Sequence, residues 1–144
     1  MLAIGADHGG YKLKEAIKAH LDWKNIKYRD FGTDSEDSCD YPVYAKKVCE
    51  AIQSGECEAG ILVCGTGIGM SIAANKFDGI RCALLTNAFS AKLTKEHNNA
   101  NVIALGGRVT AEGLALDIVD TWLEAKYQGG RHQKRLDMIA EFEK

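Results

Sequence analysis

A cysteine followed by three closely spaced glycines is the feature of this sequence with the clearest chemical potential. Cys64 ends an apolar segment and leads into Gly65-Thr66-Gly67-Ile68-Gly69, after which the residues are typical of the start of a helix. Unpaired N–H groups at a helix N-terminus favour negative charge. A thiol in that field ionises more readily than free cysteine, whose pKa is ~8.5. The loop predicts a base or nucleophile beside an oxyanion hole, although a tight turn around a buried cysteine would also fit it.

Three better-known phosphate loops do not fit this segment. A dinucleotide fingerprint starting at Gly65 requires glycine at position 70, where the chain has Met70. A cysteine phosphatase loop starting at Cys64 requires arginine at the same position. The Gly-Lys-Ser/Thr ending of a P-loop is absent. The Cys64 loop must therefore be interpreted together with the other polar groups of the chain.

Asp7 and His8 follow the first strand-like segment and precede Gly9-Gly10. In a functional interpretation both point into a cleft, where Asp7 binds sugar hydroxyls and His8 binds an anion. In a structural interpretation Asp7 caps the following helix and His8 is an exposed loop residue. The pair alone does not decide between these two interpretations.

Further candidates lie in the second half of the chain. His97, in the run Glu96-His97-Asn98-Asn99, could move protons near neutral pH or could simply end a helix. Arg131 and Arg135 are four residues apart, so on a helix they share one face. They could clamp a phosphate group, or belong to a solvated basic face.

Composition limits the class of protein. The chain has 144 residues, a net charge of −2, 46% hydrophobic and 26% charged residues, which fits one globular domain over residues 1–144. There is no strong charge for nucleic acid or anionic membranes, and no apolar run of membrane-spanning length. Five cysteines without a Cys-x-x-Cys pair argue against a disulfide framework or a zinc site. We expect a cytoplasmic protein whose N-terminus carries no leader segment.

Strand-like and helix-like segments alternate along the chain. Helical spacing of apolar residues begins near Leu13, Tyr44 and Leu114, Pro42 is placed to start a helix, and residues 131–144 form a polar terminal helix. The expected strands are Met1–Ala6, Ile26–Phe31, Gly60–Cys64, Arg81–Leu85 and Asn101–Leu105. Such alternation predicts a three-layer α/β/α sandwich, Rossmann-like, around a parallel sheet of about five strands. Functional groups in such sheets gather beyond the carboxyl ends of the strands.

The motifs in their order resemble the ribose-5-phosphate isomerase B family, within the sugar-phosphate isomerases that include galactose-6-phosphate isomerase. The resemblance covers nearly the whole chain, and Asn99 departs from it, since aspartate is the expected residue there. The matching segments are Gly5-Ala6-Asp7-His8-Gly9-Gly10, Asp40-Tyr41-Pro42, Cys64 to Ser71, Ala74-Asn75-Lys76, Gly79-Ile80-Arg81, Glu96 to Asn101, Gly106-Gly107-Arg108 and Gly129-Gly130-Arg131-His132.

The resemblance implies interconversion of ribose 5-phosphate and ribulose 5-phosphate through a cis-enediolate, without a metal or organic cofactor, in the non-oxidative pentose phosphate pathway. Cys64 would be the base, Thr66 would relay a proton between O1 and O2, and His97, with Asp7, would open the sugar ring. The implied substrate-binding residues are His8, Tyr41, Gly65, Gly67, Ile68, Gly69, Asn98, Arg108, Arg131 and Arg135.

The resemblance also implies at least a homodimer, or a tetramer, with an active site shared between subunits. His97, Asn98 and Arg108 would reach the neighbour's Cys64, and the terminal helix would contribute to the dimer and the phosphate site. Three alternatives stay open: an isomerase of allose 6-phosphate or galactose 6-phosphate, a non-catalytic sugar-phosphate-binding module, and a thiol redox sensor at Cys64. The sensor lacks a resolving cysteine close by in sequence.

Overall fold

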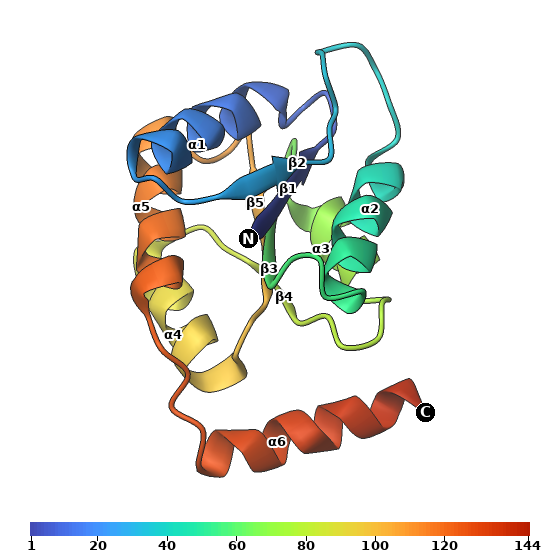
Figure 1. Cartoon of the computed structure of the whole chain (residues 1–144), viewed down its shortest axis with the longest axis vertical. Helices are drawn as coiled ribbons and strands as arrows, with labels where there is room; N and C mark the ends of the chain where they lie inside the picture. Colours follow the sequence, from blue (N-terminus) through green and yellow to red (C-terminus); the bar gives the residue numbers. More distant parts are fainter.

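Five parallel strands form one sheet in the order β2-β1-β3-β5-β4 (Figure 1). The computed structural model describes all residues from Met1 to Lys144. The strands are β1 (Leu2–Ala6), β2 (Tyr28–Asp30), β3 (Ala59–Cys64), β4 (Cys82–Leu84) and β5 (Val102–Gly106). All five predicted strand segments are confirmed, with ends that differ from the prediction by at most two residues.

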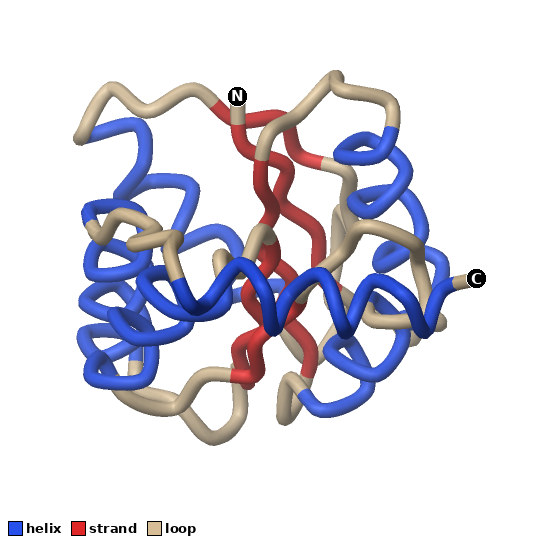
Figure 2. Tube along the Cα trace, turned by 90° about the horizontal axis from the view of Figure 1, so that it is seen from below, coloured by secondary structure: helices blue, strands red, loops and turns tan.

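Helices cover both faces of the sheet, so the three-layer sandwich is confirmed. One face carries α1 (Tyr11–Trp23), α4 (Ala88–Asn98) and α5 (Glu112–Glu124), and the other carries α2 (Tyr41–Gln53) and α3 (Ile68–Ala74). Seen from below, the sheet runs as a narrow central layer between the two groups of helices (Figure 2). None of the helices combines the length and the apolar character that crossing a membrane requires.

Alternating side chains of the central strands build a core on each face. Ile61 and Val63 belong to the cluster of 16 buried residues beneath α1 and α5, and Leu62 and Cys64 to the cluster of 13 beneath α2 and α3. Both faces of a parallel sheet are covered, which explains why β3 and β5 are apolar throughout. Trp122 is fully buried, and its Nε1 donates to the Ala100 carbonyl at 3.0 Å.

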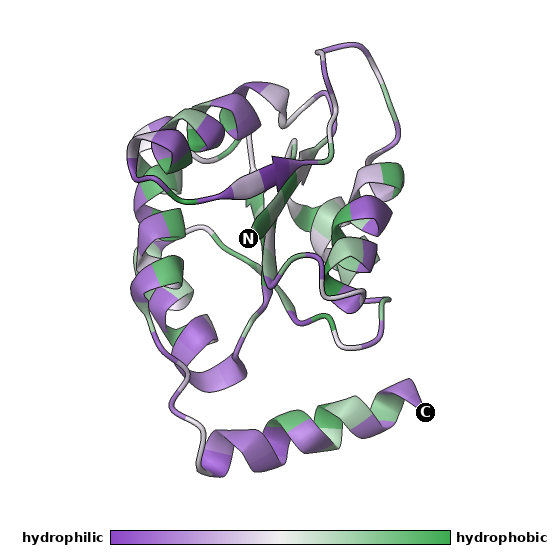
Figure 3. Ribbon diagram, viewed as in Figure 1, coloured by the Kyte–Doolittle hydropathy of each residue, from purple (hydrophilic) through white to green (hydrophobic).

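The last helix stands apart from this sandwich. The predicted terminal helix is confirmed as α6 (Arg131–Ala140), followed by a 3₁₀ turn over Glu141–Glu143. Figure 3 shows apolar residues along part of this segment, and Met138, Ile139 and Phe142 are 58%, 51% and 83% exposed. An isolated chain thus leaves apolar side chains of its terminal segment in water.

A buried lysine ties α1 to the carboxyl end of β2. Lys14 Nζ donates to both carboxylate oxygens of Asp30, at 2.8 and 2.9 Å, and to the Thr33 carbonyl at 2.6 Å. Burial opposes ionisation of Asp30, but hydrogen bonds from Lys14 and Lys18 hold the pKa of this carboxyl below its usual value. The loop that leaves β2 therefore starts from a fixed point.

We expect Lys14→Met to lower the free energy of unfolding by about 1–3 kcal/mol, because the Thr33 carbonyl loses its buried donor. Urea denaturation measures the difference. Lys12→Met on the same helix is the control, since its ion pair with Glu36 is exposed, and it should change stability by less than about 0.5 kcal/mol. Equal effects of the two substitutions would contradict the anchoring role of Lys14.

Candidate active site

Two loops meet at the carboxyl edge of the sheet, where the chain order reverses between β1 and β3. The chain goes from β1 outward to β2 and then returns to β3 on the other side of β1. Such a switch point is where open α/β sheets bind their ligands. The Asp7–Gly10 turn leaves β1 here, the Gly65–Gly69 loop leaves β3, and the Asp7 amide donates to the Val63 carbonyl at 3.2 Å.

Backbones touch directly where these loops pack together. A Cβ on Gly10 would lie 2.3 Å from the Val63 carbonyl oxygen, and one on Gly107 would lie 2.6 Å from the Gly9 carbonyl oxygen. Neither position has room for a side chain, so glycine is required there by close approach. The turn after β1 is thereby seated against the loops that follow β3 and β5.

The Cys64 loop presents an amide to the sulfur. Cys64 is 5% exposed, and its Sγ accepts a hydrogen bond from the Gly67 amide at 3.1 Å. Gly67 has a φ of 80°, a left-handed conformation that glycine adopts without strain. The amides of Gly65 and Gly69 donate no hydrogen bond within the chain. The loop therefore places one donor on the sulfur and leaves others available to a ligand.

The other four cysteines lack such surroundings. Burial raises the pKa of Cys49 and of Cys82 to about 12, and it also raises the pKa of Cys57. All five cysteines are free, and no group of three His, Cys, Asp or Glu side chains is arranged to hold a metal ion. Cys49 and Cys57 belong to the core beneath α2 and α3, and Cys82 packs against it.

Four predicted side chains surround the Cys64 loop. Thr66 Oγ1 accepts from the Ile68 amide at 3.3 Å. The Tyr41 ring, at the start of α2, lies so close to Gly69 that a Cβ there would be 2.6 Å from its Cζ. Arg108 lies over Gly65, with Nη1 3.3 Å from the corresponding Cβ position, and Asp7 follows the neighbouring strand β1. These groups come together in one chain. The expectation that Arg108 reaches across to a neighbour's Cys64 is therefore wrong, since it lies against the loop of its own chain.

Asp7 has a structural as well as a candidate chemical role. Its Oδ1 accepts from the Gly10 amide at 3.1 Å within the turn before α1. Gly10 is the N-cap of α1 and no side chain caps the helix, so the expectation that Asp7 caps it is wrong. Its Oδ2 makes no hydrogen bond within the chain, although the residue is only 7% exposed. The carboxylate thus keeps one oxygen for a ligand.

His8 is oriented by the loop that follows β2. Its Nδ1 accepts from the Cys39 amide at 3.2 Å, and the Cys39 sulfur lies 3.9 Å from the same nitrogen. No sequence pattern indicates this contact, because it joins residues 31 positions apart through a backbone group. The ring is therefore held from the side of Nδ1.

The remaining predicted site residues lie at the opposite edge of the sheet. His97 and Asn98 end α4, which runs back to the amino end of β5, and Arg131 and Arg135 belong to α6 below that edge (Figure 1). Because all five strands are parallel, this edge is the far end from Cys64. One chain therefore does not bring these four residues to the Cys64 loop.

His132 belongs to this second cluster, but sequence reasoning assigned it no role. Its ring stacks on His97 with centroids 4.3 Å apart and planes 15° apart. It is 6% exposed and its Nε2 has no hydrogen-bond partner. Desolvation, followed by the charges of His97, Arg131 and Arg135, lowers the pKa of His132. The Gly-Gly-Arg-His run was the only signal in the sequence.

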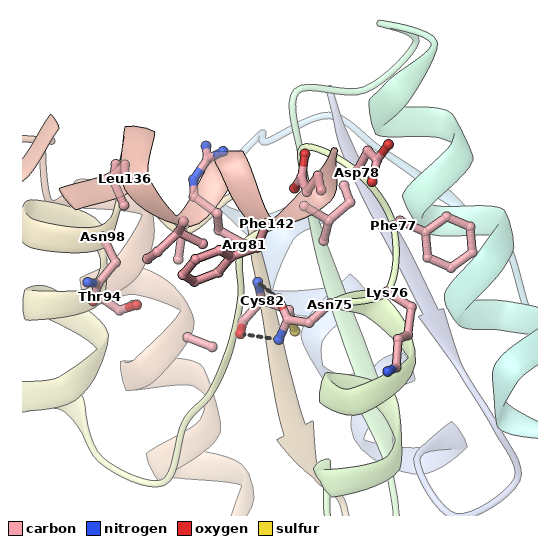
Figure 4. A pocket seen from close by; sticks show the side chains of 15 residues that line it. Asn75, Lys76, Phe77, Asp78, Arg81, Cys82, Thr94, Asn98, Leu136 and Phe142 are labelled. Atoms are coloured by element: carbon pink, nitrogen blue, oxygen red, sulfur yellow. Dashed lines mark hydrogen bonds between the residues drawn. The ribbon is translucent and has the colours of Figure 1, made fainter. Parts of the chain in front are cut away.

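A groove of about 760 Å³ lies between α6 and the amino end of β4 (Figure 4). Arg81, Asn98, Leu136 and Phe142 are among its lining residues, and the Asn75 side chain bonds the backbone of Cys82 on its wall. No motif in the sequence indicates this groove. It belongs to the edge that carries His97 and is separate from the Cys64 loop within one chain.

The fold and the Cys64 loop define an α/β enzyme with a polar site at the switch point of its sheet. The family model described as Ribose/Galactose Isomerase matches residues 2–139. Ribose-5-phosphate isomerase B of Escherichia coli is 49% identical over 142 residues, which are 99% of this chain and 95% of the relative. This chain belongs to the ribose/galactose isomerase family, as the resemblance of its motifs predicted.

Solved structures agree with this assignment. The ribose-5-phosphate isomerase B of Clostridium thermocellum superimposes with a TM-score of 0.97 at 54% identity, covering 99% of this chain and 96% of that one. The enzyme of Mycoplasma genitalium, solved with bound ribulose-5-phosphate, gives a TM-score of 0.94 at 38% identity, covering 99% and 95%. The backbone of this family is thus retained over almost its whole length.

The stacked histidines give a titration test. We expect His132 to titrate below the usual histidine value of about 6.5, and its pKa to rise in His97→Asn, because a neighbouring positive charge is removed. NMR titration of the ring signals measures both values. His8→Asn, at the other edge of the sheet, is the control and should leave the pKa of His132 unchanged. A His132 pKa that stays the same in His97→Asn would contradict the coupling.

Proposed function

We propose that the protein interconverts ribose 5-phosphate and ribulose 5-phosphate through a cis-enediolate, as an aldose–ketose isomerase of the non-oxidative pentose phosphate pathway. The observation that carries the proposal is the Cys64 sulfur, 3.1 Å from the Gly67 amide, in a family whose relatives are named ribose-5-phosphate isomerase B. Five free cysteines support placement in a reducing compartment, the cytoplasm.

In this mechanism Cys64 removes the C2 proton of the open-chain aldose and returns it to C1. Negative charge then develops on the sugar oxygens, where the free amides of Gly65 and Gly69 act as an oxyanion hole. The Thr66 oxygen accepts from the Ile68 amide, so its own proton is available to move between O1 and O2. The loop would thus supply the base, the charge stabilisation and the proton relay.

Ring opening and phosphate binding use residues from both edges of the sheet. His97, with Asp7, would open the furanose, while Tyr41 and Asn98 would line the sugar site. His8 and Arg108 would meet the phosphate together with two arginines of α6, Arg131 and Arg135. Because His97, Asn98 and the α6 arginines lie away from Cys64 in one chain, we infer that a second copy supplies them.

Exposed apolar side chains support a homodimer or a tetramer. Ile68 and Ile72 of α3 are 50% and 59% exposed beside the Cys64 loop, and Leu84 of the edge strand β4 is 40% exposed. The exposed apolar residues of α6 lie at the other edge. An isologous contact would cover both regions and bring each α6 to the partner's loop. Residues 1–144 then form one isomerase domain whose terminal helix completes the neighbour's phosphate site.

The substrate is tested with purified protein on ribose 5-phosphate and allose 6-phosphate side by side, with EDTA present. We expect turnover of ribose 5-phosphate by this chain alone and no effect of the chelator. Galactose 6-phosphate is a third substrate, since the family includes galactose-6-phosphate isomerase. Preference for a six-carbon substrate would overturn the choice of pentose, and activity that disappears with EDTA would overturn the metal-free mechanism.

Cys64→Ala removes the proposed base. We expect kcat to fall by at least ~10³ with KM little changed, because the base acts in the transition state and contributes little to ground-state binding. Exchange of the substrate C2 proton in D₂O, followed by NMR, should stop as well. Cys57→Ala is the control, a buried cysteine outside the site. Retention of more than a small fraction of turnover refutes the assignment.

Mixing two inactive variants tests the shared site. In a Cys64→Ala and His97→Asn heterodimer, one site carries both substitutions and the other carries neither, if each site takes Cys64 and His97 from different chains. Random exchange of equal amounts should therefore restore about a quarter of the parent activity. Mixtures that stay as inactive as the separate variants would show that Cys64 and His97 of a site come from one chain.

A further inference from the structure

The geometry points to a positioning role for the Cys39 backbone amide: it fixes the tautomer of His8, so that Nε2 always carries a proton toward the phosphate of the substrate. The role of His8 as a phosphate ligand rests on the proposed function. The tautomer itself follows from the contacts within this chain. Cys39 acts here through its backbone N–H on the His8 ring.

The direction of the hydrogen bond decides the tautomer. A backbone N–H can only donate, so at the 3.2 Å between the Cys39 nitrogen and His8 Nδ1 the ring nitrogen must supply the lone pair. A neutral imidazole carries one proton, which must then be on Nε2. The Cys39 thiol, 3.9 Å from the same nitrogen, is a second weak donor that favours the same tautomer.

The other nitrogen of the ring is free. His8 Nε2 makes no hydrogen bond within the chain, and the residue is only partly buried. The turn that carries His8 is seated against the Cys64 loop, since a Cβ on Gly9 would lie 3.1 Å from the Gly65 amide nitrogen. The Nε2–H of His8, which has no hydrogen-bond partner within the chain, is thus available beside the candidate active site.

The amide is held in place from both ends of its loop. At the start, the Thr33 amide donates to the Ala6 carbonyl at 2.6 Å, and Lys14 Nζ donates to the Thr33 carbonyl. At the other end, Asp40 is the N-cap of α2, directly after Cys39. Between these anchors, the only other ion pair or hydrogen bond to the β1–α1 region is the exposed Lys12–Glu36 pair. The Cys39–His8 bond is therefore the link from the loop to the site.

A fixed tautomer matters for an anionic ligand. With the proton on Nε2, the ring offers a donor to a phosphate oxygen without first having to become charged. With the proton on Nδ1, Nε2 would present a lone pair to the anion and repel it. The Cys39 amide excludes the second arrangement, because an Nδ1–H would face another N–H.

NMR of the uniformly ¹⁵N-labelled protein tests the tautomer directly. With the ring neutral, we expect the nitrogen shifts and proton couplings of His8 to show Nε2 protonated and Nδ1 unprotonated. A scalar coupling across the hydrogen bond should also join the Cys39 amide nitrogen to His8 Nδ1. Protonated Nδ1 overturns the inference, whatever the enzymatic activity.

Two substitutions at Cys39 test the consequence for binding. Cys39→Pro removes the N–H, while Cys39→Ala keeps it and removes only the thiol. We expect KM for the sugar phosphate to be about tenfold higher in Cys39→Pro than in Cys39→Ala, with similar kcat, because one hydrogen bond to a charged group is weakened. In a His8→Ala background the two variants should have the same KM.

The His8→Ala background distinguishes loss of the hydrogen bond to the His8 ring from distortion of the loop by proline. A difference between Cys39→Pro and Cys39→Ala that persists without the His8 ring would mean that proline acts by distorting the loop, and it would overturn the positioning role. Equal KM values in the parent background would overturn it as well. Absence of any isomerase activity in the unsubstituted protein would overturn the proposed function instead, and the NMR test of the ring would still stand. If Cys39→Pro does not fold, the same NMR measurement decides.

Discussion

Direct contact between backbones at the carboxyl edge of the sheet is the constraint on which the rest of the site depends. The turn after β1 touches Val63 through Gly10, and Gly107 after β5 touches Gly9, at separations that no Cβ could occupy. These contacts hold three loops that are distant in sequence against one another. Asp7, His8 and Cys64 owe their proximity to this packing, and a side chain added there would separate them.

The parallel sheet imposes a second constraint. A helix that connects two parallel strands runs back along the sheet, so its C-terminus lies at the edge opposite the carboxyl ends of the strands. His97 at the end of α4 and the arginines of α6 therefore cannot reach Cys64 of their own chain. The stack of His97 on His132 joins these two helices into one unit. Such a unit, with apolar residues exposed along α6, is suited to pack against a second copy.

Much of this architecture was predictable, because strand and helix periodicities differ and each strand ends in turn-forming residues. The Cys64 loop was predictable from its glycines. The Cys39–His8 bond, the His97–His132 stack and the groove beneath α6 were not. They depend on a backbone donor, on ring packing and on the placement of a whole helix. None of these leaves a local pattern of residue types in the sequence.

The side chains of the proposed site share one feature, which explains why structural and chemical interpretations of each motif fit equally well at first. Asp7 Oδ1 accepts from the Gly10 amide and leaves Oδ2 free, and Thr66 Oγ1 accepts from the Ile68 amide and keeps its proton. The Cys64 sulfur accepts from Gly67, and His8 accepts at Nδ1 and keeps Nε2. In each group one atom or lone pair is bound to the backbone, which orients the other toward a ligand. The structural hydrogen bond is therefore the means by which the chemical group is positioned, and the two interpretations are not alternatives.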